Sequence, residues 1–283
     1  MTNLVTIDPS ELQQKLDNAV LALESGKVLF FKLPFDLSED EVQFLTPDIV
    51  DPRSKNISYD IRGDSLRGTI CEGEKGDILK AMLRRYAHFS RRLVEKMYSH
   101  HLTQARTSFR PVEAEGRATS AHKDDTRLHV DAFPANPVSG KRILRVFTNV
   151  NPSGKPRVWR IGEPFADVAA SFIPTLGAPL PGLARLLKAL KITKTLRSPY
   201  DHYMLKLHDA MKTDLEYQKA APKEEVLFPP GSTWIVFTDQ VSHAAMSGQH
   251  MFEQSFYLPP EALKHPERSP LRILESLLQK KLI

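Results

Sequence analysis

The sequence predicts a mainly β protein with added helices, in which short strands form a barrel or a sandwich. Two observations favour this fold class. From about residue 105, short runs alternate between apolar and polar side chains, a period that is typical of strands. Gly, Pro, Asn and Asp break these runs, and the clearest of them are 127–133, 143–150, 233–238 and 254–258.

Helical segments are expected on both sides of the β core and inside it. We predict one domain over residues 1–283, with an N-terminal part of helices and a strand, a β core that carries a helical insertion, and a C-terminal helix. The corresponding ranges are 1–105, 106–260 with the insertion at 160–225, and 261–283.

The N-terminal part offers boundaries for individual elements. Ser10 is a candidate N-cap for a helix over 10–25, in which apolar residues recur every three or four positions before a glycine. The run 27–33 predicts a strand, and Ser38 followed by three acidic residues predicts a short helix. A long helical pattern occupies 76–104.

The composition is that of an ordinary globular protein, with 41% hydrophobic and 26% charged residues. The single cysteine, Cys71, argues against a disulfide framework and a cysteine-based zinc cluster. We find no apolar run long enough for a transmembrane helix and no secretory signal, so a cytoplasmic location is expected. The net charge of +5 fits an acidic partner, but it also fits a merely basic surface.

The stretch 127–133 predicts a metal site. In a strand, residues i and i+2 point to the same face, so His129 and Asp131 are expected to project together. One imidazole and one carboxylate are two thirds of the facial triad that binds Fe(II), although a His-x-Asp pair alone is common. The third ligand is expected at His243, which begins a strand after the buried run 233–238. His129, Asp131 and His243 are therefore the predicted metal ligands and catalytic residues.

Several longer segments resemble the Kdo hydroxylases (3-deoxy-D-manno-oct-2-ulosonic acid dioxygenases) of Gram-negative bacteria. The segments are RLHVDAFPANP (127–137), KRILRVFTNVNP (141–152), FPPGSTWIVFTDQVSHAAMSGQHMFEQSFYLP (228–259), LESGKVLFFKLPF (23–35) and KNISYDIRGDSLRG (55–68). The resemblance implies a double-stranded β-helix (jelly-roll, cupin-like) core and an oxygenase that uses Fe(II), 2-oxoglutarate and O₂. It also implies hydroxylation at carbon 3 of a Kdo sugar on the lipid A core, which gives Ko, succinate and CO₂.

The cation for the far carboxylate of 2-oxoglutarate is less obvious. Many such enzymes place an arginine about ten residues after the distal histidine, but here those positions hold Glu253 and Gln254. Arg145 is the alternative, because an arginine on an otherwise apolar strand calls for an anion unless it reaches solvent or pairs with an acid. Asn149 shares its face, and Gln254 and Ser255 are candidates for added hydrogen bonds to the cosubstrate.

An acidic sugar on a phosphorylated lipid calls for cations in the substrate site. The candidates are loop and strand residues near the predicted ligands and in the N-terminal part, each of which can equally be a solvated surface charge. They are Arg127, His122, Lys123, Arg117, Arg62, Arg67 and Arg160.

Two segments have the pattern of interfacial helices. In 181–192 four leucines fall on one helical face and basic residues on the other, and 181–197 contains no acid. The tail 271–283 has similar features. Both are predicted to contact the anionic cytoplasmic face of the inner membrane, with packing onto the β core or a dimer interface as the alternative.

Other functions fit the same residues. A 2-oxoglutarate oxygenase for another small molecule or for a protein would use the same triad, and a non-catalytic, membrane-binding β-barrel protein would not need the iron. A nucleic-acid binder is not expected, because the basic residues are dispersed and no recognised nucleic-acid module is present. The oligomeric state and the particular Kdo residue stay open.

Overall fold

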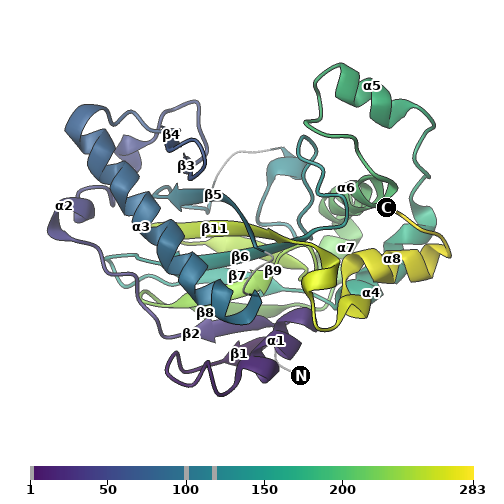
Figure 1. Ribbon diagram of the computed structural model, residues 1–283, viewed down its shortest axis with the longest axis horizontal. Coiled ribbons are helices and arrows are strands. Elements are labelled where there is room, and N and C mark those ends of the chain that lie inside the picture. The colour runs from purple at the N-terminus through teal and green to yellow at the C-terminus, as the bar shows by residue number, and fades with distance from the viewer. Residues whose placement is uncertain (1–2, 99–101, 117–119) are drawn as a thin grey trace.

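The computed structural model describes residues 3–98, 102–116 and 120–283, and within this part of the chain the strands form two sheets (Figure 1). The large sheet has eight strands in the order β1-β2-β9-β6-β11-β5-β3-β4, and the small sheet has the order β10-β7-β8. Neighbouring strands are antiparallel except for β1 and β2. The strands of the large sheet are β1 (Leu4–Thr6), β2 (Val28–Phe31), β3 (Ile57–Asp60), β4 (Ser65–Arg67), β5 (Thr103–Arg110), β6 (Arg142–Asn149), β9 (Thr233–Phe237) and β11 (Met251–Leu258). Those of the small sheet are β7 (Arg157–Ile161), β8 (Glu224–Phe228) and β10 (His243–Ser247).

The inner faces of the two sheets meet in an aromatic core. Phe147 of β6 contacts Trp159 of β7 with ring centroids 5.0 Å apart, and Phe228 of β8 stacks on Trp234 of β9 at 4.0 Å. Each of these side chains is almost fully buried, which contributes roughly 1.5–3 kcal/mol for each large apolar group. Two facing sheets of this kind form the jelly roll that the resemblance implies.

Helices cover the outer face of the large sheet. α1 (Leu16–Glu24) and α3 (Gly73–Tyr98) pack their apolar faces on the outward side chains of β6, β9 and β11 (Figure 1). Because side chains alternate along a strand, Leu144 and Val146 face these helices while Arg145 and Phe147 face the interior of the jelly roll. The same alternation places the even-numbered residues of β11 under the helices and the odd-numbered ones on the inner face.

The remaining helices gather at one end of the sheets. α4 (Phe165–Phe172), α6 (Pro199–Thr213) and α8 (Pro270–Leu278) share one apolar cluster, and α7 (Leu215–Ala220) follows α6. A second short helix of the N-terminal part is α2 (Glu39–Val42), where the Ser38 amide donates to Glu41, as the acidic run after Ser38 predicts. Figure 1 shows α5 (Leu183–Ala189) at the end of a long excursion, away from both sheets.

The structure corrects several predicted boundaries. Residues 127–133 form an extended segment with a single bridge, His129 to His243, rather than a regular strand, because their neighbour there is only the first residue of β10. The predicted limit between 105 and 106 falls inside β5, whose pairing with β11 overrides the helical pattern up to 104. The insertion likewise starts after Ile161, where β7 ends, and ends before β8 at Glu224.

The helix predicted over 10–25 begins only at Leu16, and Ser10 instead donates its hydroxyl to Asp8. Among the described residues, no helix is both long and apolar enough to cross a lipid bilayer.

Candidate metal centre

His129, Asp131 and His243 come together between the two sheets. Their candidate ligand atoms lie within 4.8 Å of one another, and each residue is less than a tenth exposed. His129 and His243 exchange backbone hydrogen bonds, with N–O distances of 3.0 and 2.9 Å, which fixes the bridge between the ligand segment and β10. The Asp131 amide donates to the Thr238 carbonyl at 2.8 Å and anchors the other end of the segment. The i, i+2 prediction is confirmed, although the segment is not a regular strand.

Both imidazoles are held in the tautomer that a metal needs. His129 Nδ1 lies 2.8 Å from the Arg127 carbonyl oxygen, and His243 Nδ1 lies 2.8 Å from that of Val241. A carbonyl only accepts, so each Nδ1 carries the proton and each Nε2 keeps a free lone pair. The two rings are 4.6 Å apart between centroids, and Trp159 stacks on His243 at 5.0 Å.

Burial and charge set the protonation states of the three ligands. Burial lowers the pKa of His129 and of His243, which keeps both rings neutral. Burial alone would raise the pKa of Asp131, but the charges around it, that of the Arg145 guanidinium foremost, together more than offset burial, and the pKa falls below its usual range. Two neutral imidazoles and one carboxylate are the protonation states that a divalent metal requires.

Arginines and carboxylates alternate around the ligands. Arg145 reaches Asp131 at 3.0 Å through Nη2 and Glu253 at 3.1 Å through Nη1. Arg110 of β5 contacts Glu253 from the other side and lies 3.9 Å from Asp125. Each of these cations therefore has two carboxylate partners, and the cluster is close to neutral without a ligand.

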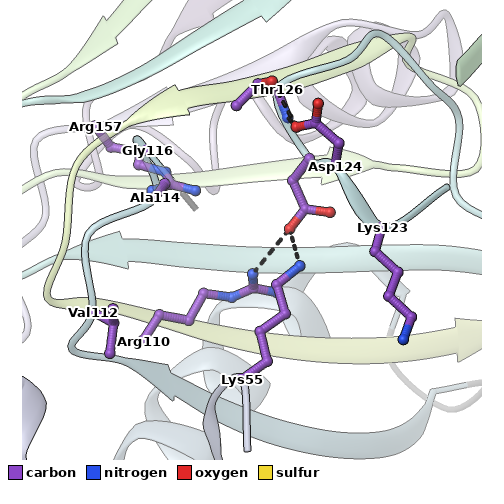
Figure 2. A pocket seen from close by; sticks show the side chains of 10 residues that line it. Lys55, Arg110, Val112, Ala114, Gly116, Lys123, Asp124, Thr126 and Arg157 are labelled. Atoms are coloured by element: carbon purple, nitrogen blue, oxygen red, sulfur yellow. Dashed lines mark hydrogen bonds and ion pairs between the residues drawn. The ribbon is translucent and has the colours of Figure 1, made fainter. Parts of the chain in front are cut away.

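The cavity at the metal ligands is small, about 60 Å³, but it shares lining residues with two larger spaces. The first, about 140 Å³, adds Lys55 and Lys123, and Figure 2 shows Lys55 beside Arg110 in it. Lys55 binds the Asp125 carboxylate at 2.5 Å. The second, about 570 Å³, meets the cavity at Arg145 and Glu253.

The structure separates the residues predicted to bind 2-oxoglutarate. Arg145 lines the metal cavity, and Ser255 lies close by on the wall of the larger space. Gln254 is wrong for this role: it faces the outer helices and bonds to Thr107 and the Ala105 carbonyl, because adjacent residues of β11 face opposite ways. Asn149 is also wrong, since its amide donates to two backbone carbonyls at the far end of β6.

The predicted substrate residues are likewise divided. Lys123 lines the 140 Å³ space and Arg62 the 570 Å³ space, whereas Arg117 lies outside the described residues. The other four do not line the cavities at the metal. Arg127 bonds to Asp124 and the Lys212 carbonyl, His122 contacts Asp209, Arg160 contacts Glu225 at 3.6 Å, and Arg67 is exposed on β4.

Sequence reasoning missed several residues of the site. Arg110, Arg157 and Trp159 line the metal cavity, and the His208 ring meets that of His129 edge-on at 5.4 Å. All three lining residues lie on β5 or β7, so a correct strand assignment with its alternation would have found them. Buried Lys212, whose pKa burial lowers, comes from α6 and carries no such signal.

The donor set fits iron. Two imidazole nitrogens and one carboxylate on one side of an otherwise arginine-lined cavity form the facial triad that binds Fe(II) and leaves further positions open. In keeping with an open donor, Asp131 Oδ1, the carboxylate oxygen that Arg145 does not contact, lies 3.7 Å from His129 Nε2. A jelly roll with this triad defines the class of non-haem Fe(II), 2-oxoglutarate-dependent oxygenases.

Comparison with known proteins narrows the class. The family model for 3-deoxy-D-manno-oct-2-ulosonic acid (Kdo) hydroxylase matches residues 6–281, and the chain belongs to this family. No curated protein sequence matches the chain with significance.

Solved structures of the Kdo hydroxylase KdoO, a non-haem Fe(II) α-ketoglutarate-dependent dioxygenase, resemble the chain over its whole length. The cobalt(II) complex has a TM-score of 0.96 and 52% identity and covers 100% of this chain and 98% of that one. The complex with α-ketoglutarate and Fe(III) has a TM-score of 0.95 and 52% identity, with 99% and 97% covered. The complex with succinate and Fe(III) has a TM-score of 0.95 and 51% identity, and the match covers 100% of this chain and 98% of that one.

Proposed function

We propose that this protein hydroxylates carbon 3 of a Kdo sugar on the lipid A core, with 2-oxoglutarate and O₂ as cosubstrates and Ko, succinate and CO₂ as products. The observation that carries the proposal is the buried triad of His129, Asp131 and His243 in a chain that is 52% identical to a Kdo hydroxylase. When bound, iron supplies the oxidative decarboxylation of 2-oxoglutarate and the transfer of one oxygen atom to a substrate C–H bond.

The protein holds and orients the reactants. His129 and His243 offer Nε2 to the metal because their Nδ1 protons are engaged by backbone carbonyls. Asp131 offers the oxygen that Arg145 does not occupy, and the same contact keeps the carboxylate from rotating. The aromatic wall of Phe147 and Trp159 shields the cavity from water on the small-sheet side.

Arg145 is our candidate for the far carboxylate of 2-oxoglutarate. Its Nε is buried without a hydrogen-bond partner among the described residues, which leaves one donor for a ligand. A carboxylate that binds there would join Asp131 and Glu253 around a guanidinium with five donors. Arg110 and Arg157 line the same cavity and add positive potential for a dianion.

The test is turnover of a defined glycolipid. The purified protein is incubated with Fe(II), 2-oxoglutarate and Kdo-lipid A, O₂ is admitted, and succinate and the mass of the lipid are measured. We expect succinate together with a gain of one oxygen atom on the sugar, and loss of both in His243→Ala. His250→Asn is the matched control: His250 is buried but does not line the metal cavity, and asparagine tolerates its left-handed φ of 57°. Succinate without an oxidised sugar would show that Kdo is not the substrate. A complete lack of succinate would contradict the oxygenase activity itself.

We also propose that the enzyme meets its substrate at the anionic cytoplasmic face of the inner membrane through residues 181–197. Leu186 and Leu190 are 54% and 60% exposed, and no side chain of α5 is buried, so much of this apolar face is open to solvent. The same segment carries basic residues and no acid, which suits a surface of anionic lipid. Co-sedimentation with anionic vesicles measures this contact.

The structure corrects the prediction of membrane contact for the second segment, 271–283. In 271–283 the apolar residues Leu271, Leu274 and Leu282 are buried in the cluster with α4 and α6. This tail therefore packs onto the protein, and we do not assign membrane contact to it.

A further inference from the structure

The largest space beside the metal cavity is a groove of about 570 Å³, a size that is typical of ligand sites. The inner faces of β5, β6 and β11 form its floor, and the loop after Asp131 forms one wall. The metal cavity lies at one end, where Arg145 and Glu253 belong to both linings. Lys194 and Thr195, which follow α5, lie on the rim. The groove therefore connects the reaction centre with the segment that we assign to the membrane.

The charges in the groove are not balanced. Beyond Arg145 it is lined by four cations, Arg62, Arg106, Lys141 and Lys194. Among the described residues, none of these four side chains lies within ion-pair distance of a carboxylate. The lining carboxylates are Asp60, which accepts the Arg62 amide, and Glu253, which Arg110 and Arg145 already neutralise.

Cations gathered in one concave space repel one another and raise the local concentration of anions. Lys141 comes directly before β6 and four residues before Arg145, so their backbones lie about 13 Å apart along the strand direction. An anion that binds there is therefore too far from the metal to be the 2-oxoglutarate. Hydroxyl and amide groups interleave with the cations, as recognition of a sugar requires, and they belong to Asn136, Ser139, Thr195, Ser255 and Tyr257.

We infer that this groove binds the anionic oxygen groups of the glycolipid, phosphate or carboxylate, that lie away from the hydroxylated carbon. The inference rests on the proposed function, which it deepens by naming a second contact region for the same substrate. Arg106, Lys141 and Lys194 are the residues that would contact these groups, and they are specificity residues rather than catalytic ones.

The test uses a soluble probe, so that membrane binding by α5 does not enter. The probe is deacylated Kdo-lipid A, a phosphorylated glucosamine disaccharide that carries Kdo, and its affinity is measured by calorimetry in the presence of Co(II) and 2-oxoglutarate without O₂. The triple variant Arg106→Gln, Lys141→Gln, Lys194→Gln is expected to bind it at least tenfold more weakly. KM for turnover of the probe should rise by the same factor, with kcat within about twofold.

A control variant with the same loss of charge separates the groove from the net charge. Lys32→Gln, Arg92→Gln, Lys96→Gln removes three exposed cations, one directly after β2 and two on α3, none of which lines the groove, and this variant should bind like the wild type. Equal affinity of the two triple variants would overturn the inference and leave the proposed function intact. A wild type that neither binds nor oxidises the probe would overturn both.

A phosphatase-treated probe identifies the anion. If phosphate is the ligand, the treated probe binds the wild type at least tenfold more weakly, and the groove variant loses little more. If the carboxylates are the ligands, the treated probe binds the wild type unchanged and the groove variant still loses tenfold. Either result supports the groove and names its partner.

Discussion

The two ends of the inner face of the large sheet treat positive charge differently. At the metal end, Arg110 and Arg145 each contact two carboxylates and are largely buried. At the other end, Lys141 and Arg106 are exposed and have no carboxylate within ion-pair distance in the described structure. A buried charge without a partner costs several kcal/mol, whereas an exposed one costs little. The protein thus supplies its own carboxylates for the buried arginines at the metal end. The exposed cations at the other end are solvated by water and stay available to an anionic ligand.

The largest predicted effect comes from removing a counter-charge at the metal end. Glu253 is 5% exposed, and although burial raises its pKa, Arg110 and Arg145 more than offset this and hold the carboxylate ionised. Glu253→Gln leaves both guanidiniums with excess buried charge, so we expect the free energy of unfolding to fall by about 3 kcal/mol. Urea denaturation of the metal-free protein measures the loss. Added succinate should restore part of it, because a bound carboxylate replaces the missing one.

Lys141→Gln is the matched change at the other end. It also neutralises one charge, but on an exposed side chain, so the free energy of unfolding should change by less than about 0.5 kcal/mol. Similar losses in Glu253→Gln and Lys141→Gln would mean that the two ends do not differ in the way their charges are balanced.

A second prediction concerns pH. Burial lowers the pKa of His129 and His243 in the metal-free protein, whereas the unfolded chain binds these protons near pH 6.5. The unfolded state therefore holds more protons below that pH, and stability falls as the pH drops, by up to about 1.4 kcal/mol per pH unit for each histidine, until the folded-state pKa is reached. Between pH 7 and 5.5 we expect the wild type to lose more stability than the double variant His129→Asn, His243→Asn.

Denaturation at several pH values in the presence of a chelator measures the slope of the free energy of unfolding against pH for each variant. Arg106→Gln in the groove should keep the wild-type slope, since an arginine stays protonated in both states throughout this range. Equal slopes for the wild type and the double histidine variant would show that the two ligands are not held neutral by burial.

The sequence predicted what alternation and local spacing determine. His129 and Asp131 share a side because they are two residues apart, and Arg145 faces them because Leu144 and Val146 belong to the opposite, helix-covered face. It failed at Gln254 because alternation was not applied to β11, and at Asn149 because the outcome depends on a distant partner. Adjacent residues of a strand face opposite ways, so Ser255 and Gln254 of β11 cannot both face the site, and Gln254 faces the outer helices. Asn149 is on the same face of β6 as Arg145, but its side-chain amide donates to the Phe228 carbonyl of β8.

The two basic amphipathic segments, 181–197 and 271–283, also differ in a way that depends on distant partners. Their patterns are alike, but Leu274 of α8 is fully buried against α4 and α6, whereas Leu186 of α5 and Leu190 directly after it face solvent. A pattern of leucines and lysines says that a helix has an apolar face, and only the tertiary structure says whether the protein itself covers that face. The base of the α5 excursion is fixed beside the groove, where the Lys194 amide donates to the Ala135 carbonyl at 3.0 Å.

The third prediction uses this difference at the membrane. Leu186→Ser, Leu190→Ser removes apolar surface that the folded protein does not bury, so stability should be unchanged while binding to vesicles with anionic lipid weakens on the order of tenfold. Leu277→Ser is the control, because Leu277 is 44% exposed on α8 and should leave binding unaltered. Binding of the wild type should also weaken in high salt, since the basic residues of 181–197 act through screened charge. If Leu277→Ser weakened sedimentation as much as the α5 change, the membrane surface would not be specific to α5, and if neither did, the exposed leucines of α5 would serve another purpose.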